Sequence, residues 1–174
     1  MSAKRISFRA LLVWGGLAAA LAVLIVFGLS GSKGSVGRAA PTLPASRLSG
    51  EAVTLASLRG RPALVVFWAS WCTPCEQEAP ALERFARELH GRATLVGVNW
   101  SDPSLSGAKA FVKRFGWTFP NLRDGDETSG QKYGVSGLPT TYAIDGSGRI
   151  RATLRGPQTQ ASLSHALAFA GGRP

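Results

Sequence analysis

The sequence predicts an α/β protein whose central β-sheet is mixed and carries helices on both faces. Ala63–Trp68 is a continuous apolar run typical of a strand buried on both sides, and Thr94–Asn99 predicts a second buried strand. Segments of helical periodicity alternate with these strands, as in sheets built from strand–helix–strand units. Near the C-terminus, Thr140–Ile144 and Ile150–Leu154 flank Asp145–Gly148, whose sequence is a hairpin signal. The hairpin adds antiparallel strands, so we expect a mixed sheet.

The remaining elements follow from periodicity and from capping residues. Helices are expected over 72–90, 104–115, 127–133 and 159–170, and a short strand with a turn over Val53–Leu58. Gly91 ends the first helix, and the hydroxyl of Ser104 is suited to cap the second. With 174 residues, the chain has room for one domain of ordinary size.

The N-terminus has the pattern of a membrane signal anchor. Residues 1–9 carry three basic side chains and no acid, and Ala10–Leu29 runs for 20 residues without a charge. As a helix, such a run spans about 30 Å, the thickness of a bilayer core. The basic segment should stay in the cytoplasm, so the rest of the chain faces outward from a single-pass cell membrane anchor. A cleaved signal peptide is the alternative, and it also places the domain outside the cytoplasm.

Residues 30–44 are rich in Gly, Ser and Pro and predict a flexible linker, followed by a domain over 45–174. The formal net charge of the chain is +10, with 20 basic and 10 acidic residues. Five basic residues precede residue 45 and every acid follows it, so the domain carries 15 minus 10, or +5. Its basic residues are scattered singly, unlike the clusters of a nucleic-acid surface. We therefore expect no nucleic-acid partner.

The two cysteines of the chain, Cys72 and Cys75, lie two residues apart where a buried strand should pass into a helix. The N-terminus of a helix presents unpaired N–H groups and the positive end of its dipole, which favour a thiolate. Cys72 is therefore expected to be the nucleophile. Cys75, one turn further on and less accessible, should resolve the mixed disulfide. Trp71 should flank the exposed sulfur and contact the substrate.

Two other interpretations of the cysteine pair remain. A structural disulfide would close a loop so short that it constrains the unfolded chain little. A structural zinc site needs four ligands, and besides the cysteines the chain offers only His90 and His165, neither of them nearby in sequence. We expect a redox-active disulfide, with no metal and no other cofactor.

The segment Phe67–Cys75 resembles the active-site segment of thioredoxin-like proteins, and the similarity continues through Tyr133–Tyr142 and Ile144–Gly148. Together with the predicted anchor, the chain most resembles the extracytoplasmic thiol-disulfide oxidoreductases of the TlpA/ResA/DsbE group over residues 46–170. The order Thr73-Pro74 departs from some members that act in cytochrome c maturation, which have Pro-Thr between the cysteines.

The resemblance implies roles for residues outside the cysteine pair. Pro139 matches the family's cis-proline, which lies beside the cysteines, and with Leu138 and Thr140 it should contact the substrate. Some members have Glu at the position of Thr140. Glu78 matches an acidic residue used near the buried thiol, where a partly buried carboxylate can carry protons; a first-turn glutamate favouring the helix dipole is the alternative. Residues 116–126 resemble an insertion between a strand and a helix.

The resemblance also implies the reaction. The expected activity is reduction of a disulfide in apocytochrome c in the periplasm, before haem attachment, with electrons from a thiol reductase in the membrane. Thiol-disulfide exchange is reversible, so the motif leaves the direction open. The alternatives are a general extracytoplasmic disulfide reductase or oxidant, a copper-site assembly factor for a respiratory oxidase, and a purely structural tethered domain.

Overall fold

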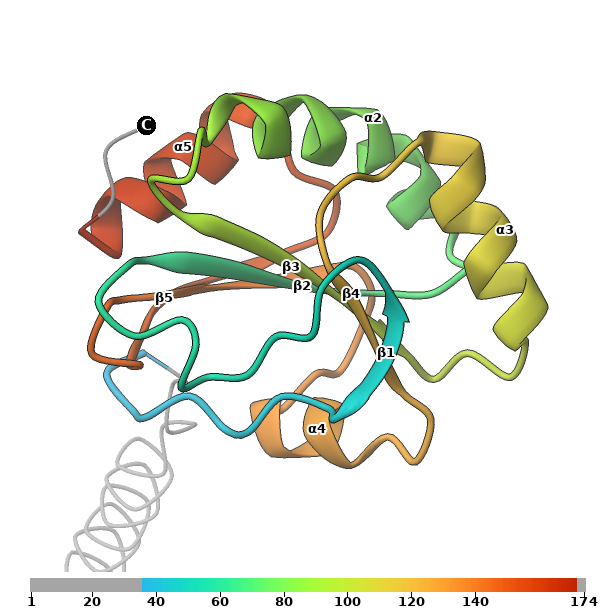
Figure 1. Cartoon of the computed structure of the whole chain (residues 1–174), viewed down its shortest axis with the longest axis horizontal. Coiled ribbons are helices and arrows are strands. Elements are labelled where there is room, and N and C mark those ends of the chain that lie inside the picture. The colour runs from blue at the N-terminus through green and yellow to red at the C-terminus, as the bar shows by residue number, and fades with distance from the viewer. Residues whose placement is uncertain (1–35, 172–174) are drawn as a thin grey trace, which may run out of the picture. The chain divides into compact units, whose positions relative to one another are not determined.

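The computed structural model describes residues 36–171 and contains one mixed sheet, with strand order β1-β4-β3-β2-β5-β6 (Figure 1). The strands are β1 (Ser46–Ser49), β2 (Ala63–Trp68), β3 (Thr94–Trp100), β4 (Asn121–Asp124), β5 (Thr140–Ile144) and β6 (Ile150–Arg155). The helices are α2 (Thr73–Glu88), α3 (Leu105–Phe115), α4 (Thr128–Tyr133) and α5 (Gln160–Phe169). The central strands β2, β3 and β4 are parallel, and the other pairings are antiparallel. The predicted mixed α/β class is confirmed.

Each face of the sheet has its own core. Figure 1 shows α2, α3 and α5 over one face and α4 over the other. Because side chains alternate along a strand, neighbouring residues of β2 enter different cores. Trp68 stacks on Phe111 of α3, with ring centroids 4.8 Å apart. Phe67 points to the other side, where its ring centroid lies 5.1 Å from that of Tyr133 in α4. β2 is thus held from both sides immediately before the cysteines.

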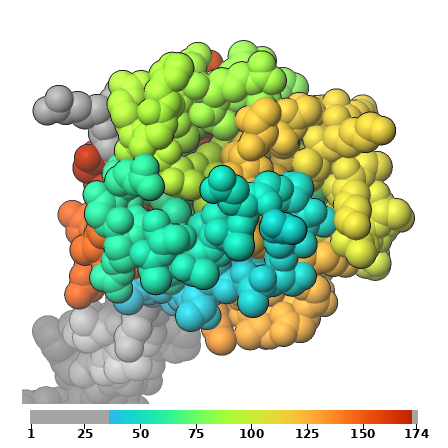
Figure 2. All heavy atoms as spheres, viewed as in Figure 1, coloured from blue at the N-terminus to red at the C-terminus, as the bar shows by residue number. Residues whose placement is uncertain are grey.

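The strand expected over Val53–Leu58 is wrong. Thr54 and Ser57 bond to each other's backbone, with the Thr54 N–H donating to Ser57 Oγ and the Ser57 N–H to Thr54 Oγ1. Such local bonds offer the backbone an alternative to a sheet ladder and favour turns. Figure 2 shows residues of this segment (teal) on the near surface of the domain.

Two strands were missed by the sequence analysis because they are polar. β1 has one buried apolar side chain, Leu48, and β4 has Leu122. The residues 116–126, expected as an insertion, contain β4, which pairs with β1 on one side and β3 on the other. Buried Asn121 is satisfied by Trp68, whose Nε1–H donates to Asn121 Oδ1 over 3.1 Å. Residues 121–124 therefore form a strand because neighbouring strands and Trp68 satisfy their polar groups, although their sequence has no strand pattern.

Part of the expected flexible linker, residues 30–44, is attached to the domain. Gly37 N–H donates to the Ile150 carbonyl over 2.7 Å, and Ile150 N–H donates to the Arg38 carbonyl over 3.0 Å. The Arg38 guanidinium also donates to the carbonyl of Tyr133 over 2.7 Å. A polar, Gly-rich segment can pair with the free backbone groups of an edge strand, here β6. Segments 1–9 and 10–29 lie outside the described residues; within residues 36–171, no helix is long and apolar enough to cross a membrane.

Candidate active site at the Cys72–Cys75 disulfide

Cys72 and Cys75 form a disulfide at the start of α2, with Cα atoms 5.2 Å apart. Cys72 is the N-cap of the helix, and its Sγ accepts the N–H of Cys75 over 3.1 Å. The predicted position of Cys72 at a helix N-terminus is confirmed. A thiolate there would receive the same N–H bond and the positive end of the helix dipole.

Accessibility does not distinguish the two sulfurs as strongly as expected. Cys72 is 3% exposed and Cys75 is 1% exposed, so both are nearly enclosed in this oxidised state. What separates them is their position on the helix, since Cys72 caps it and Cys75 lies within its first turn. The assignment of Cys72 as nucleophile and Cys75 as resolving thiol therefore rests on the field at the helix N-terminus.

The residues just before Cys72 are held by the loop after β3. Trp71 is 58% exposed, and its indole Nε1–H donates to the Ser101 carbonyl over 2.8 Å. The backbone N–H of Ser70 donates to Asp102 Oδ2 over 2.6 Å. The ring of Trp71 thus has a fixed orientation while most of its surface stays open to a partner.

Asp102 is a site residue that the sequence analysis missed. Its carboxylate also accepts the Nδ2–H of Asn99 over 2.8 Å and the N–H of Ser104 over 3.0 Å. Burial raises the pKa of Asp102, but the hydrogen bonds from Asn99, Ser70 and Ser104 outweigh burial and leave this pKa below its ordinary value. A signal was available: β2 and β3 are adjacent parallel strands, so the residues that follow them meet at one edge of the sheet.

Leu138 and Pro139 lie beside the end of β2. The bond between them is cis, as the resemblance implies. Thr140 pairs with Phe67 in the antiparallel register of β5 and β2, which places the preceding Leu138–Pro139 next to the segment leading to Cys72. Leu138 is partly buried and packs against both cores.

The side chain of Thr140 is not placed to contact a substrate. Thr140 is 1% exposed, and its hydroxyl donates to the Gly137 carbonyl over 2.7 Å. This hydrogen bond stabilises the loop that contains the cis-proline. The carbonyl of Pro139 accepts the N–H of Gly156 over 2.9 Å, which ties the same loop to the end of β6.

Glu78 lies on α2 three residues after Cys75, on the same side of the helix. It is 1% exposed, and its Oε2 accepts the N–H of Gln158 over 2.9 Å. Its Oε1 has no hydrogen-bond partner among the described residues. Burial raises the pKa of Glu78 to about 8, although the Gln158 hydrogen bond lowers it in part. A carboxyl with this pKa can hold or accept a proton near neutral pH, a role that a first-turn glutamate acting only on the helix dipole does not have.

This geometry supports thiol-disulfide exchange, and comparison with known proteins agrees. The AhpC/TSA family matches residues 36–153. The chain belongs to this family. ResA of Geobacillus thermodenitrificans, a thiol-disulfide oxidoreductase, is 34% identical over 134 residues, which cover 76% of each chain. HelX of Rhodobacter capsulatus, a thiol:disulfide interchange protein, is 38% identical over 127 residues, covering 71% of this chain and 70% of HelX.

A solved structure of similar fold is also a thiol:disulfide interchange protein. The thiol:disulfide interchange protein DsbE from Chlorobium tepidum matches with a TM-score of 0.70 and 27% identity, covering 78% of this chain and 96% of that one. The fold is thioredoxin-like, and the chain is a thiol-disulfide oxidoreductase of the TlpA/ResA/DsbE group.

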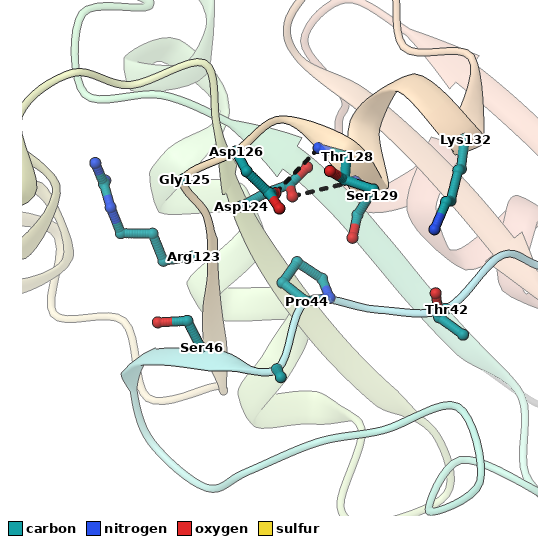
Figure 3. A pocket seen from close by; sticks show the side chains of 11 residues that line it. Thr42, Pro44, Ser46, Arg123, Asp124, Gly125, Asp126, Thr128, Ser129 and Lys132 are labelled. Atoms are coloured by element: carbon teal, nitrogen blue, oxygen red, sulfur yellow. Dashed lines mark hydrogen bonds between the residues drawn. The ribbon is translucent and has the colours of Figure 1, made fainter.

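Residues 36–171 also contain polar groups away from the cysteines. In the described residues, no three His, Cys, Asp or Glu side chains are grouped so that they could hold a metal ion. A cleft of about 450 Å³ lies between residues 42–46, the end of β4 and α4 (Figure 3). Its buried carboxylate, Asp124, accepts the N–H groups of Ser129 and Gly130. Figure 3 draws the bond from Ser129 as a dashed line. This cleft shares no residue with the cysteine site.

Proposed function

We propose that this protein reduces a disulfide of apocytochrome c on the outer side of the cell membrane. In this proposal, residues 10–29 anchor the domain, and a thiol reductase in the membrane returns Cys72 and Cys75 to the dithiol state. The likeness to ResA, HelX and DsbE supports the proposal at the level of the group. The substrate comes from the resemblance of the sequence to members that serve cytochrome c maturation.

The chemistry proceeds in two exchanges. The Cys72 thiolate attacks one sulfur of the substrate disulfide, forming a mixed disulfide and releasing the other sulfur as a thiolate. Cys75 then loses its proton and attacks Cys72 Sγ, forming the Cys72–Cys75 disulfide and releasing the second substrate thiolate. Two electrons pass to the substrate, and the two released thiolates take up protons.

The structural observation that supports the exchange chemistry of this proposal is the buried carboxyl of Glu78, on the same side of α2 as Cys75. Because its pKa is raised to about 8, Glu78 can accept the proton of Cys75 when the mixed disulfide is resolved and can return it when the dithiol is regenerated. Burying a carboxyl whose Oε1 has no hydrogen-bond partner among the described residues costs free energy, and a purely structural disulfide gives no reason for that cost.

The test is a trapping experiment with the full-length Cys75→Ser variant. Removing the resolving thiol should make mixed disulfides accumulate through Cys72, and mass spectrometry should identify apocytochrome c among the trapped proteins. The Cys72→Ser variant is the control and should trap none. Trapping of many unrelated proteins would favour a general reductase, and no trapped species in cells where the wild type cycles would contradict Cys72 as the nucleophile.

The copper-assembly alternative has a separate measurement. A copper-site assembly factor would bind copper stoichiometrically and lose it on Cys72→Ser substitution. Copper titration of the reduced wild type and of this variant therefore separates a metallochaperone from a reductase. We expect the reduced wild type to reduce a protein disulfide, and the Cys72→Ser variant to lose that activity.

A further inference from the structure

A small cleft lies beside the cis-proline loop, apart from the cysteines themselves. It measures about 170 Å³ and is lined by residues 136–140 of the loop and by Arg155 and Gly156 at the end of β6. Thr140 pairs with Phe67 of β2 on one side and with Arg155 of β6 on the other. The sheet register therefore puts Arg155 two strands away from the segment that leads into Cys72, with Leu138–Pro139 beside that segment.

Arg155 brings a positive charge to this cleft. Its side chain is exposed, and its Nη1 donates to Ser136 Oγ over 3.0 Å, a bond that holds the guanidinium over the loop. A guanidinium has five N–H donors in a planar fork that matches a carboxylate. The bond to Ser136 uses one of these donors. The other donors and the positive charge of the guanidinium remain available to a ligand.

Within residues 36–171, no carboxylate lies at ion-pair distance from Arg155. Ion pairs in the described part of the chain join Arg87 to Glu83, Arg114 to Glu76 and Arg151 to Asp145, and none includes Arg155. Arg151 provides the contrast on the same strand, because its Nε lies 3.6 Å from Asp145 Oδ2. The two arginines are both exposed, but one has a carboxylate partner and the other faces the cleft.

The geometry points to a carboxylate subsite formed by Arg155 and Ser136, which binds an Asp or Glu side chain close in sequence to the substrate cysteine. A substrate segment that passes Leu138–Pro139 to bring its disulfide to Cys72 brings its neighbouring residues to the cleft. The subsite would select acidic segments among cysteine-containing partners, since a charge-assisted bond to a guanidinium is stronger than a neutral one. This inference rests on the proposed attack by Cys72, and it is independent of which protein is the substrate.

The test uses peptides that differ in one charge. Each peptide carries one cysteine in a mixed disulfide with 2-mercaptoethanol. One of the four neighbouring positions, two before the cysteine and two after it, is Glu, Gln or Lys in turn. The rate constant for the reaction with the reduced full-length protein is divided by that for dithiothreitol, which removes the intrinsic effect of the charge on the disulfide. At one position at least, the normalised rate should be about three- to tenfold higher for Glu than for Gln, and lowest for Lys.

Variants of the two arginines separate the subsite from general attraction. Arg155→Gln should bring the Glu-to-Gln ratio close to one, and Arg155→Glu should reverse the preference towards Lys. Arg151→Gln removes the same charge from the same strand and should keep the ratio of the wild type. Equal normalised rates for the three peptides, or a ratio unchanged in Arg155→Gln, would overturn the subsite alone. If the wild type reacts with none of the peptides, the proposed attack by Cys72 fails and the subsite fails with it.

Discussion

Replacing Glu78 with Gln should change how the stability of the oxidised protein depends on pH. Burial raises the pKa of Glu78 from the ordinary 4.5 to about 8. Between these two values the folded protein holds a proton that the unfolded chain releases. The stability tied to this proton is therefore complete below pH 4.5 and is lost as the pH rises through about 8. The loss is about 1.4 kcal/mol per pH unit and at most about 5 kcal/mol in total.

The glutamine side chain has nearly the shape of the protonated glutamic acid and does not titrate, so the Glu78→Gln variant should lack this loss. Its amide oxygen can still accept the N–H of Gln158. The free energy of unfolding of the variant minus that of the wild type should rise steadily between about pH 5 and pH 8. The same substitution should slow disulfide exchange and flatten its pH profile, because the proton carrier of Cys75 is gone.

The assay is urea unfolding of the disulfide form at constant ionic strength, at several pH values from 5 to 9. The matched control is Glu88→Gln, which removes an exposed carboxyl from the same helix and should show a much smaller change with pH. A difference between Glu78→Gln and the wild type that is the same at pH 5 and pH 8 would refute the argument. It would mean that the carboxyl is already ionised, or is solvated, in the folded protein.

Two further substitutions test the parts that position the site. Asp102→Ala removes the acceptor of the Ser70 N–H and should lower the free energy of unfolding by about 2–4 kcal/mol and slow disulfide exchange, measured by urea unfolding and by reductase rates. A loss below about 1 kcal/mol with an unchanged rate would count against this role. Gly97→Ala would place its Cβ against Asn121 Oδ1 and should cost at least about 2 kcal/mol in urea unfolding. Gly137→Ala, which has open space at that position, is the control and should change stability little; equal effects would contradict the packing argument.

Where sequence analysis succeeded, the signal was local. The uninterrupted apolar run Ala63–Trp68 became β2 because such a run has to be covered on both faces, and the predicted buried strand Thr94–Asn99 became β3. Ser104 caps α3 as expected, with its Oγ accepting the Gly107 N–H over 2.9 Å. The position of Cys72 at the start of a helix also followed from the order of strand and helix along the chain.

Where it failed, the deciding interactions left no mark on the periodicity of the segment. Val53–Leu58 has strand-like residues, but a pair of hydroxyl side chains turned the backbone, whereas polar β4 became a strand between β1 and β3. Residues 37–40 were expected to be part of a free linker and instead pair with β6 and the hairpin next to it. None of these outcomes follows from periodicity. The turn depends on local side-chain bonds, and the pairing of β4 and of residues 37–40 depends on backbone groups supplied by other elements.

The sequence by itself determined the chemistry of this protein: two cysteines at the spacing of an exchange motif, at the start of a helix, in a fold that a resemblance identified. Only the tertiary structure decided what surrounds them. Asp102 meets Ser70 because β2 and β3 are parallel neighbours, and Arg155 reaches the cis-proline loop because β5 pairs with β6. Glu78 acquires its raised pKa because the folded domain buries its carboxyl, and the N–H of Gln158 offsets this only in part. Burial and register are properties of the assembled sheet, and a single stretch of sequence does not contain them.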